Sequence, residues 1–129
     1  MRASLTRTVM TIKSQLVGTT TILRVHGTMT AAAGERGLRD VIRQAVADGV
    51  RTVIVNMQDA TSIDSSGVSD LASGHMILAN NAGSLKLCCL SKKLRDVFVV
   101  TRLDKVFDIH ETEAAAVASA EPSPNQPGS

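Results

Sequence analysis

Runs rich in β-branched residues alternate along this chain with runs that have the apolar spacing of a helix. This alternation limits the fold more than any other feature. Residues 53–55 are Val-Ile-Val, which is typical of a strand buried on both faces. Before this strand, apolar residues recur at the spacing of one helix face, namely Leu38, Val41, Ile42, Ala45 and Val46. Repeated strand and helix order predicts an α/β fold, in which helices pack against a sheet.

The same patterns predict the order of the elements. Strands are expected at residues 10–17, 20–26, 50–57, 84–90 and 106–109, and helices at 34–48, from about Val68 to 82, after Ser91, and at 111–118. Gly27 is expected to end the second strand. These elements predict a mixed β-sheet of about four to five strands with about four helices packed against it.

The chain of 129 residues has the length of a single domain. Residues 1–9 show no clear pattern and are expected to form a flexible leader, so the domain is expected to span residues 10–118. Residues 119–129 hold all three prolines of the chain. Such a Pro/Ser-rich segment cannot bury enough apolar surface to offset the entropy of ordering, and we expect a disordered tail.

Composition and charge exclude several classes of function. The chain has no Trp or Tyr and a net charge of +2 from scattered basic residues, so direct binding of nucleic acid is not expected. No apolar run approaches the roughly 18 to 20 residues of a membrane span, which predicts no membrane insertion. There is no signal-peptide core, and the two cysteines are adjacent and poorly placed to bridge each other. We therefore expect a cytoplasmic protein.

The segment Asp64-Ser65-Ser66-Gly67 lies where a predicted buried strand gives way to a helix. Helix N-termini carry unpaired backbone N–H groups and a partial positive charge, so a phosphate on Ser65 could be held there. Gly67 would allow a partner to approach closely. The alternative is that Asp64, Ser65 or Ser66 only caps the helix, which is the usual role of such residues. The local sequence leaves both interpretations open.

A wider set of residues resembles one known family. It consists of the Asp64–Gly67 motif, the strand at residues 52–57, Gly83-Ser84-Leu85-Lys86-Leu87, Leu94-Arg95-Asp96-Val97-Phe98, and Leu103 with Val106-Phe107. Over roughly residues 12–118 the chain resembles the STAS-domain anti-sigma factor antagonists. In that family the serine after the aspartate is phosphorylated by a partner that is both anti-sigma factor and serine kinase. The resemblance places this phosphorylation at Ser65, with Ser66 at the neighbouring Ser/Thr position.

The resemblance implies regulation by partner switching. The unphosphorylated domain would bind the anti-sigma kinase and free a sigma factor, whereas phosphate on Ser65 would add about −1.5 to −2 charges and release the kinase. A serine phosphatase would be a further partner. The chain has no Walker glycine loop or dinucleotide fingerprint, so we expect no cofactor on this domain and ATP on the partner kinase.

The expected partner contact comprises Asp64, Ser66, Gly67, Ser69, Asp70 and Met76. Two segments differ from the family pattern. Gly27-Thr28-Met29-Thr30 lacks the acidic residues of Gly-Glu-Leu-Asp, and the usual small or apolar residues after the motif are here Ser69 and Asp70. Met76 and Ile77 lie off the apolar stripe of their helix. Either they pack beneath a neighbouring element, which is the commoner outcome, or they form an apolar contact patch beside Ser65.

The sequence leaves two alternatives to this function, a scaffold and an enzyme. The domain could be a scaffold or accessory subunit of a signalling or transporter complex, in which Ser65 and Ser66 only cap the helix. Hydrolysis is disfavoured because Ser65 lacks a Gly-x-Ser-x-Gly frame. The three histidines have no metal-ligand spacing, so no metal is expected. The sequence thus predicts a protein that is not an enzyme.

Overall fold

The computed structural model describes residues 11–29 and 37–120. These residues form five strands, four α-helices and one short 3-10 helix, as the sequence predicts for an α/β domain. The elements in chain order are β1 (Thr11–Val17), β2 (Thr20–Met29), α1 (Leu38–Ala47), β3 (Thr52–Ile63), α2 (Ser65–Ala79), β4 (Ser84–Cys88), α3 (Lys92–Val100), η1 (Leu103–Lys105), β5 (Asp108–His110) and α4 (Glu113–Ala120).

The five strands form one mixed sheet in the order β1-β2-β3-β4-β5. β1 and β2 are antiparallel, and the remaining neighbours are parallel. The hairpin between β1 and β2 turns at Gly18, whose φ of 65° is accessible to glycine at little cost. Because β2 to β5 all run in one direction, their carboxyl ends meet at one edge of the sheet, and the Asp64–Gly67 motif follows β3 at that edge.

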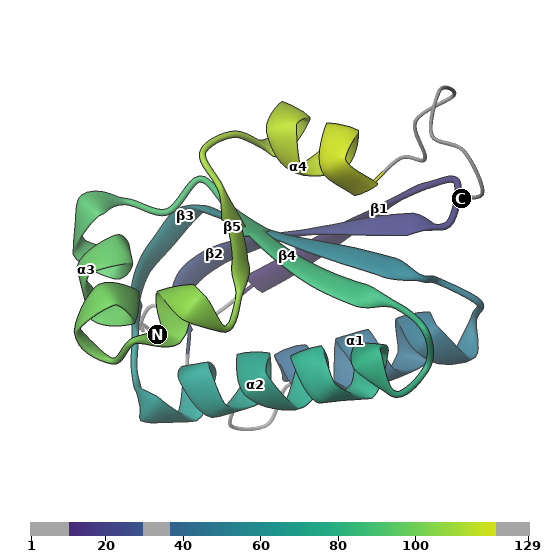
Figure 1. Cartoon of the computed structure of the whole chain (residues 1–129), viewed down its shortest axis with the longest axis horizontal. Helices are drawn as coiled ribbons and strands as arrows, with labels where there is room; N and C mark the ends of the chain where they lie inside the picture. The colour runs from purple at the N-terminus through teal and green to yellow at the C-terminus, as the bar shows by residue number, and fades with distance from the viewer. Residues whose placement is uncertain (1–10, 30–36, 121–129) are drawn as a thin grey trace, which may run out of the picture.

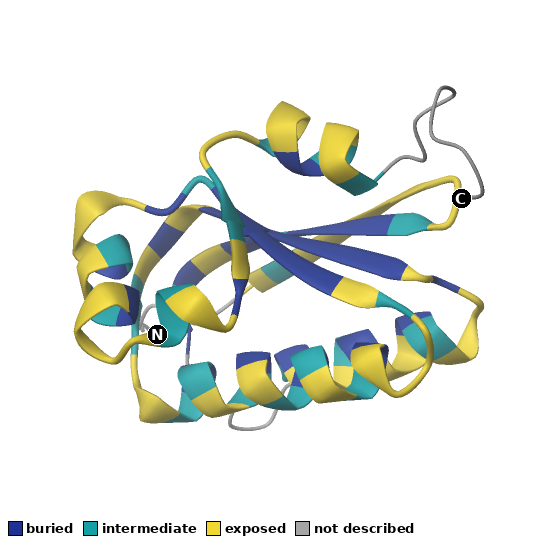
Figure 2. Cartoon of the chain, viewed as in Figure 1, coloured by how far each residue is buried: buried dark blue, intermediate teal, exposed yellow. Residues whose placement is uncertain are grey.

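Helices cover both faces of the sheet (Figure 1). α1 and α2 lie against one face, α4 lies against the other, and α3 stands at one end of the strands. The main core lies beneath α1 and α2 and includes Leu23, Val55 and Leu87 from three adjacent strands. A smaller cluster beneath α4 comprises Ile22, Ile54, Cys88 and Ala116. Figure 2 shows the resulting pattern, with buried residues on the sheet and on the inner sides of the helices.

Several predicted boundaries differ from the observed ones, and two of these differences change the surroundings of the Asp64–Gly67 motif. Gly27 does not end β2, because its φ of 96° accommodates an irregularity in pairing with β3, after which β2 continues to Met29. β3 likewise continues to Ile63 rather than ending at residue 57. Both strands are therefore longer than predicted and remain paired as far as Met29 and Ile63. This pairing brings the end of β2 against the start of α2.

The ends of the predicted domain fall partly outside the described residues. The predicted leader at residues 1–9 lies outside them, as does the tail from residue 121 onward. α4 includes Ser119 and Ala120, the first two residues of the segment that the sequence assigns to the tail. Within the described part of the chain, no helix is long and apolar enough to cross a membrane.

Candidate functional site

The Asp64–Gly67 motif forms the junction between β3 and α2. Asp64 is extended, with φ −107° and ψ −176°, and is the N-cap of α2. Its carboxylate accepts a hydrogen bond of 2.9 Å from the backbone N–H of Gly67. The capping role that the sequence left open among three residues therefore belongs to Asp64.

Ser65 is the first residue of α2 and is exposed. Among the described residues its hydroxyl has no hydrogen-bond partner, whereas Ser66 beside it is half-buried. The first turn of α2 contains no acidic residue, so apart from the Asp64 cap nothing in that turn opposes the positive end of the helix dipole. Ser65 thus presents an exposed hydroxyl, without a hydrogen-bond partner in the described part of the chain, at a helix N-terminus.

Gly67 has an internal role that the sequence did not reveal. It is buried, and a Cβ at this position would collide with the backbone carbonyl of Met29 and with the side chain of Ile63. The close approach that Gly67 permits is therefore between α2 and the ends of β2 and β3. Contact of a partner with Gly67 stays a prediction, and the space that a Cβ would occupy is filled by the chain itself.

The exposed face of α2 begins at Ser65. Ser69, Ala72 and Met76 are exposed at the i+4, i+7 and i+11 positions from Ser65 and so share its face. Met76 is 61% exposed, but eleven residues of helix place it about 16 Å from Ser65 along the axis. It is on the same surface as Ser65 rather than beside it, whereas Ile77 packs against the core.

Asp70 differs from the other predicted contact residues of α2. It is half-buried and follows Ser69 by about 100° around the helix, so it lies on the flank of the face that carries Ser65. The structure therefore brings Ser65, Ser69 and Met76 onto one exposed surface and places Asp70 at its margin.

Hydroxyl side chains cluster at the ends of β2 and β3, and the sequence patterns did not predict this cluster. Thr28 Oγ1 lies 3.4 Å from Thr61 Oγ1 and 3.4 Å from Ser62 Oγ. Thr28 and Ser62 are partners in the strand pairing, and Ser62 precedes Ser65 by three positions in the chain. Thr28 stands where the family pattern has an acidic residue, and Thr30 lies outside the described residues. The ends of β2 and β3 thus carry uncharged hydroxyls where the family pattern has an acidic residue.

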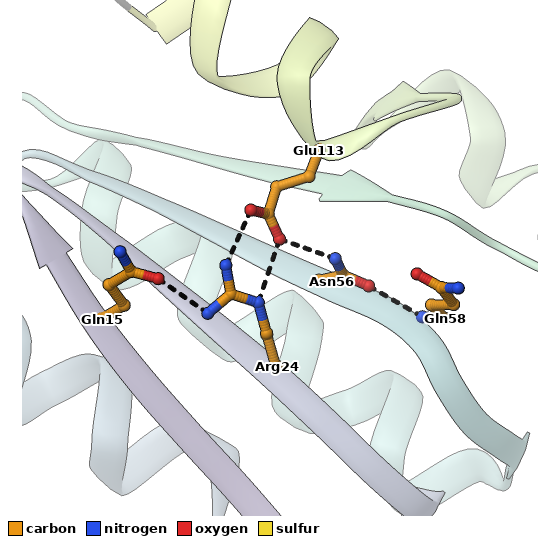
Figure 3. A network of polar contacts seen from close by, with 5 residues as sticks. All are labelled: Gln15, Arg24, Asn56, Gln58 and Glu113. Carbon is orange, nitrogen blue, oxygen red and sulfur yellow. Dashed lines mark hydrogen bonds and ion pairs between the residues drawn. The ribbon is translucent and has the colours of Figure 1, made fainter.

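The opposite face of the sheet holds a second candidate, an open polar cavity of about 560 Å³ beside α4. Figure 3 shows the network that crosses it. Arg24 donates two hydrogen bonds to Glu113, at 3.2 and 2.8 Å, and a third to Gln15 at 2.8 Å. Asn56 donates to Glu113 at 2.7 Å and accepts from the backbone of Gln58 at 2.9 Å. These groups are engaged with one another, so the network fastens α4 to the sheet.

The remaining reactive groups do not assemble into a site within the described ranges. Burial, together with a hydrogen bond to Cys89, raises the pKa of the Cys88 thiol to about 12, so Cys88 is protonated at neutral pH. No group of three or more His, Cys, Asp or Glu side chains in residues 11–29 and 37–120 is placed to hold a metal ion. The Asp64–Gly67 junction therefore remains the candidate site.

Comparison with known proteins adds an independent observation. A model of the STAS domain matches residues 11–116. The solved structure of the anti-sigma factor antagonist SpoIIAA in its unphosphorylated form is 27% identical, with a TM-score of 0.72, over 84% of this chain and 95% of that chain. The Bacillus cell fate determinant SpoIIAA in its phosphorylated form is 26% identical, with a TM-score of 0.67, over 86% and 100%. An anti-sigma factor antagonist from Mycobacterium paratuberculosis shares the fold at 20% identity, with a TM-score of 0.75, over 86% and 93%.

Proposed function

The chain belongs to the STAS domain family, and we propose that it is an anti-sigma factor antagonist controlled by phosphorylation of Ser65. In its unphosphorylated form it binds an anti-sigma factor that is also a serine kinase, and a sigma factor is released. Phosphorylation of Ser65 ends that binding, and a serine phosphatase restores it. The domain acts by binding and not by catalysis.

The observation that carries this proposal is the free hydroxyl of Ser65. Because Asp64 already caps α2, neither the fold nor the helix needs a hydrogen bond from Ser65. The side chain is exposed at the first position of the helix, where a kinase can reach it. The similar protein SpoIIAA has been solved in both an unphosphorylated and a phosphorylated form, which supports the same chemistry here.

Charge provides the physical basis of the switch. Phosphate adds about −1.5 to −2 charges at pH 7, and it would be attached next to the carboxylate of Asp64. A partner that covers the exposed Ser65 would have to desolvate this new charge. Repulsion from Asp64 adds to that cost, so the phosphorylated surface loses affinity for a partner shaped to the neutral serine.

ATP belongs to the kinase in this scheme. The γ-phosphoryl group passes from ATP on the partner to Ser65 Oγ, the hydroxyl loses its proton, and ADP leaves with the partner. The exposed face of α2, with Ser69 and Met76, forms the rest of the contact surface, and Asp70 borders it.

Mass spectrometry of the protein isolated from its own cells tests the modification. Trypsin should release residues 52–86 as one peptide, which contains Ser65, Ser66 and Ser69. We expect phosphate on Ser65 at a level that changes with growth condition. Ser65→Ala should remove the phosphate, whereas the matched variant Ser66→Ala should keep it. Phosphate that persists in Ser65→Ala, or is absent under every condition, would contradict the proposal.

A binding experiment tests the switch itself. Ser65→Ala should retain the anti-sigma kinase from the same cells, and Ser65→Asp should not. The purified kinase with ATP should phosphorylate the unmodified chain and then release it, and the sigma factor should return to the kinase. Equal binding of the kinase by Ser65→Ala and Ser65→Asp would instead support a scaffold in which Ser65 has no regulatory role.

A further inference from the structure

β1 is an edge strand without the usual protection. Among residues 11–29 and 37–120 it pairs only with β2, and all of its residues except Ile12 are exposed. Leu16 and Val17 are 65% and 42% exposed, so this strand carries two of the large exposed apolar residues of the described chain. Natural edge strands are commonly short, bulged, or blocked by charges or proline. β1 pairs over seven residues with no register shift, and its only charge is Lys13.

The turn at Gly18 determines which backbone groups of β1 face outward. In a hairpin with a two-residue loop, the residues that flank the loop form a hydrogen-bonded pair, here Val17 and Thr20. Hydrogen bonding then alternates along the strand, so the odd-numbered residues of β1 bond to β2. The N–H and C=O groups of Ile12, Ser14 and Leu16 point away from the sheet and have no backbone partner within the described residues.

The side chains of the same three residues share one face of the sheet. Ser14 and Leu16 line a cleft of about 270 Å³ between β1 and α1, together with Val41 and Ala45. Ile12 packs against the edge of the main core. Lys13 and Gln15 alternate with them onto the opposite face, where Gln15 bonds to Arg24.

We propose that β1 pairs antiparallel with β1 of a second copy of this chain, with the two Ser14 residues opposite each other on a twofold axis. This register joins two five-stranded sheets into one continuous sheet. Each Ile12 then faces a Leu16 of the other copy, and each Lys13 faces a Gln15. Every outward-pointing residue is paired with another outward-pointing residue, as antiparallel hydrogen bonding requires.

Self-complementarity is what selects a second copy as the partner. Ile12 meets Leu16, the hydroxyl of Ser14 meets the same hydroxyl of the other copy, and Lys13 meets a neutral amide. Val17 faces Thr11, so no like charges are opposed anywhere along the pair. Centring the pair on Lys13 would also pair outward-pointing residues with each other, but it would place the two lysines directly opposite each other. Ser65 follows β3, two strands from the paired edge, so dimerisation is distinct from the phosphorylation switch.

Sedimentation velocity on the full chain over a wide concentration range tests the proposal. We expect a reversible equilibrium between monomer and dimer. Ser14→Glu places two carboxylates against each other on the axis and should weaken dimerisation at least about tenfold, which corresponds to about 1.4 kcal/mol. The matched variant Gln15→Glu makes the same charge change one residue away, but it faces Lys13 and should keep or strengthen the dimer.

Mixing two variants tests the register directly. Ser14→Glu and Ser14→Lys should each dissociate alone and associate when mixed, because opposite charges then meet on the axis. Far-UV circular dichroism and the melting temperature should show that all variants fold. A full-length chain that is monomeric at every concentration would overturn the proposal. A dimer that Ser14→Glu leaves unchanged would overturn it as well, because the interface would lie elsewhere.

Discussion

Replacing Glu113 by alanine should loosen α4 from the sheet at a cost of about 2 kcal/mol. Asn56 accounts for most of this cost, because it is only 7% exposed and its side-chain amide would lose the acceptor that lies 2.7 Å away. A buried donor left without a partner costs about 1–3 kcal/mol. Arg24 adds less, because its side chain is 42% exposed and water can replace the carboxylate.

Thermal unfolding followed by circular dichroism measures this effect. For a domain of this size 2 kcal/mol corresponds to a decrease of about 8 °C in melting temperature. Glu111→Ala is the matched control, since Glu111 is exposed beside the same cavity and should change the melting temperature little. Glu113→Gln keeps an acceptor for Asn56 and should cost less than Glu113→Ala. Equal effects of Glu111→Ala and Glu113→Ala would refute the argument that the network holds α4.

The same carboxylate makes stability depend on pH. Burial raises the pKa of Glu113, but hydrogen bonds from Asn56 and Arg24 and the charge of Arg24 outweigh it, so the pKa lies below its ordinary value of 4.5. The unfolded chain therefore binds this proton more readily than the folded chain. The stabilisation from Glu113 is complete above about pH 4.5 and is lost as the pH falls through the folded pKa. Glu113→Gln should weaken the pH dependence of the free energy of unfolding in this acidic range. An unchanged pH dependence would contradict the contribution that we assign to Glu113.

Three further substitutions test other parts of the structure. Gly67→Ala should cost about 1–3 kcal/mol in chemical denaturation because its methyl group meets backbone, and Gly74→Ala should cost less because it meets only a flexible side chain. Met76→Lys should weaken kinase binding in calorimetry at an unchanged melting temperature, and a parallel loss of stability would point to packing instead. Lys86 is 10% exposed and bonds Asp108 at 2.7 Å, so Asp108→Ala should destabilise more than Lys86→Met in denaturant titrations, because only the former leaves a buried charge unpaired.

Local patterns predicted the elements that depend on local forces. The run at residues 53–55 lies in the buried first half of β3, and the stripe from Leu38 to Val46 forms the inner side of α1. Patterns failed where distant pairing overrides a local signal. Gly27 predicts the end of a strand, yet β2 continues beyond it because β2 stays paired with β3 and Gly27 adopts a positive φ. β5 is three residues long at 108–110, and so short a strand is set by its neighbour β4 rather than by its own sequence.

The candidate site shows the same division. The sequence located Asp64–Gly67 at a strand-to-helix junction, but Asp64, Ser65 and Ser66 are all residue types that cap helices, so composition could not choose among them. The choice follows from the backbone, which turns the Asp64 carboxylate toward the N–H of Gly67. The role of Gly67 depends on Met29, which is 38 positions earlier in the chain and reaches the motif only through the pairing of β2 with β3.

Within this motif, fixing the backbone and presenting the hydroxyl are assigned to different residues. Asp64 satisfies an N–H group of the helix, and Gly67 lets α2 start directly beneath the end of β2, so both act on the chain's own backbone. Neither contact involves the side chain of Ser65. Because the motif holds Ser65 in place without using its hydroxyl, a charge can be added to or removed from that oxygen without breaking a hydrogen bond of the fold. A reversible modification needs this separation, since a serine that also capped the helix would couple every phosphorylation event to the stability of α2.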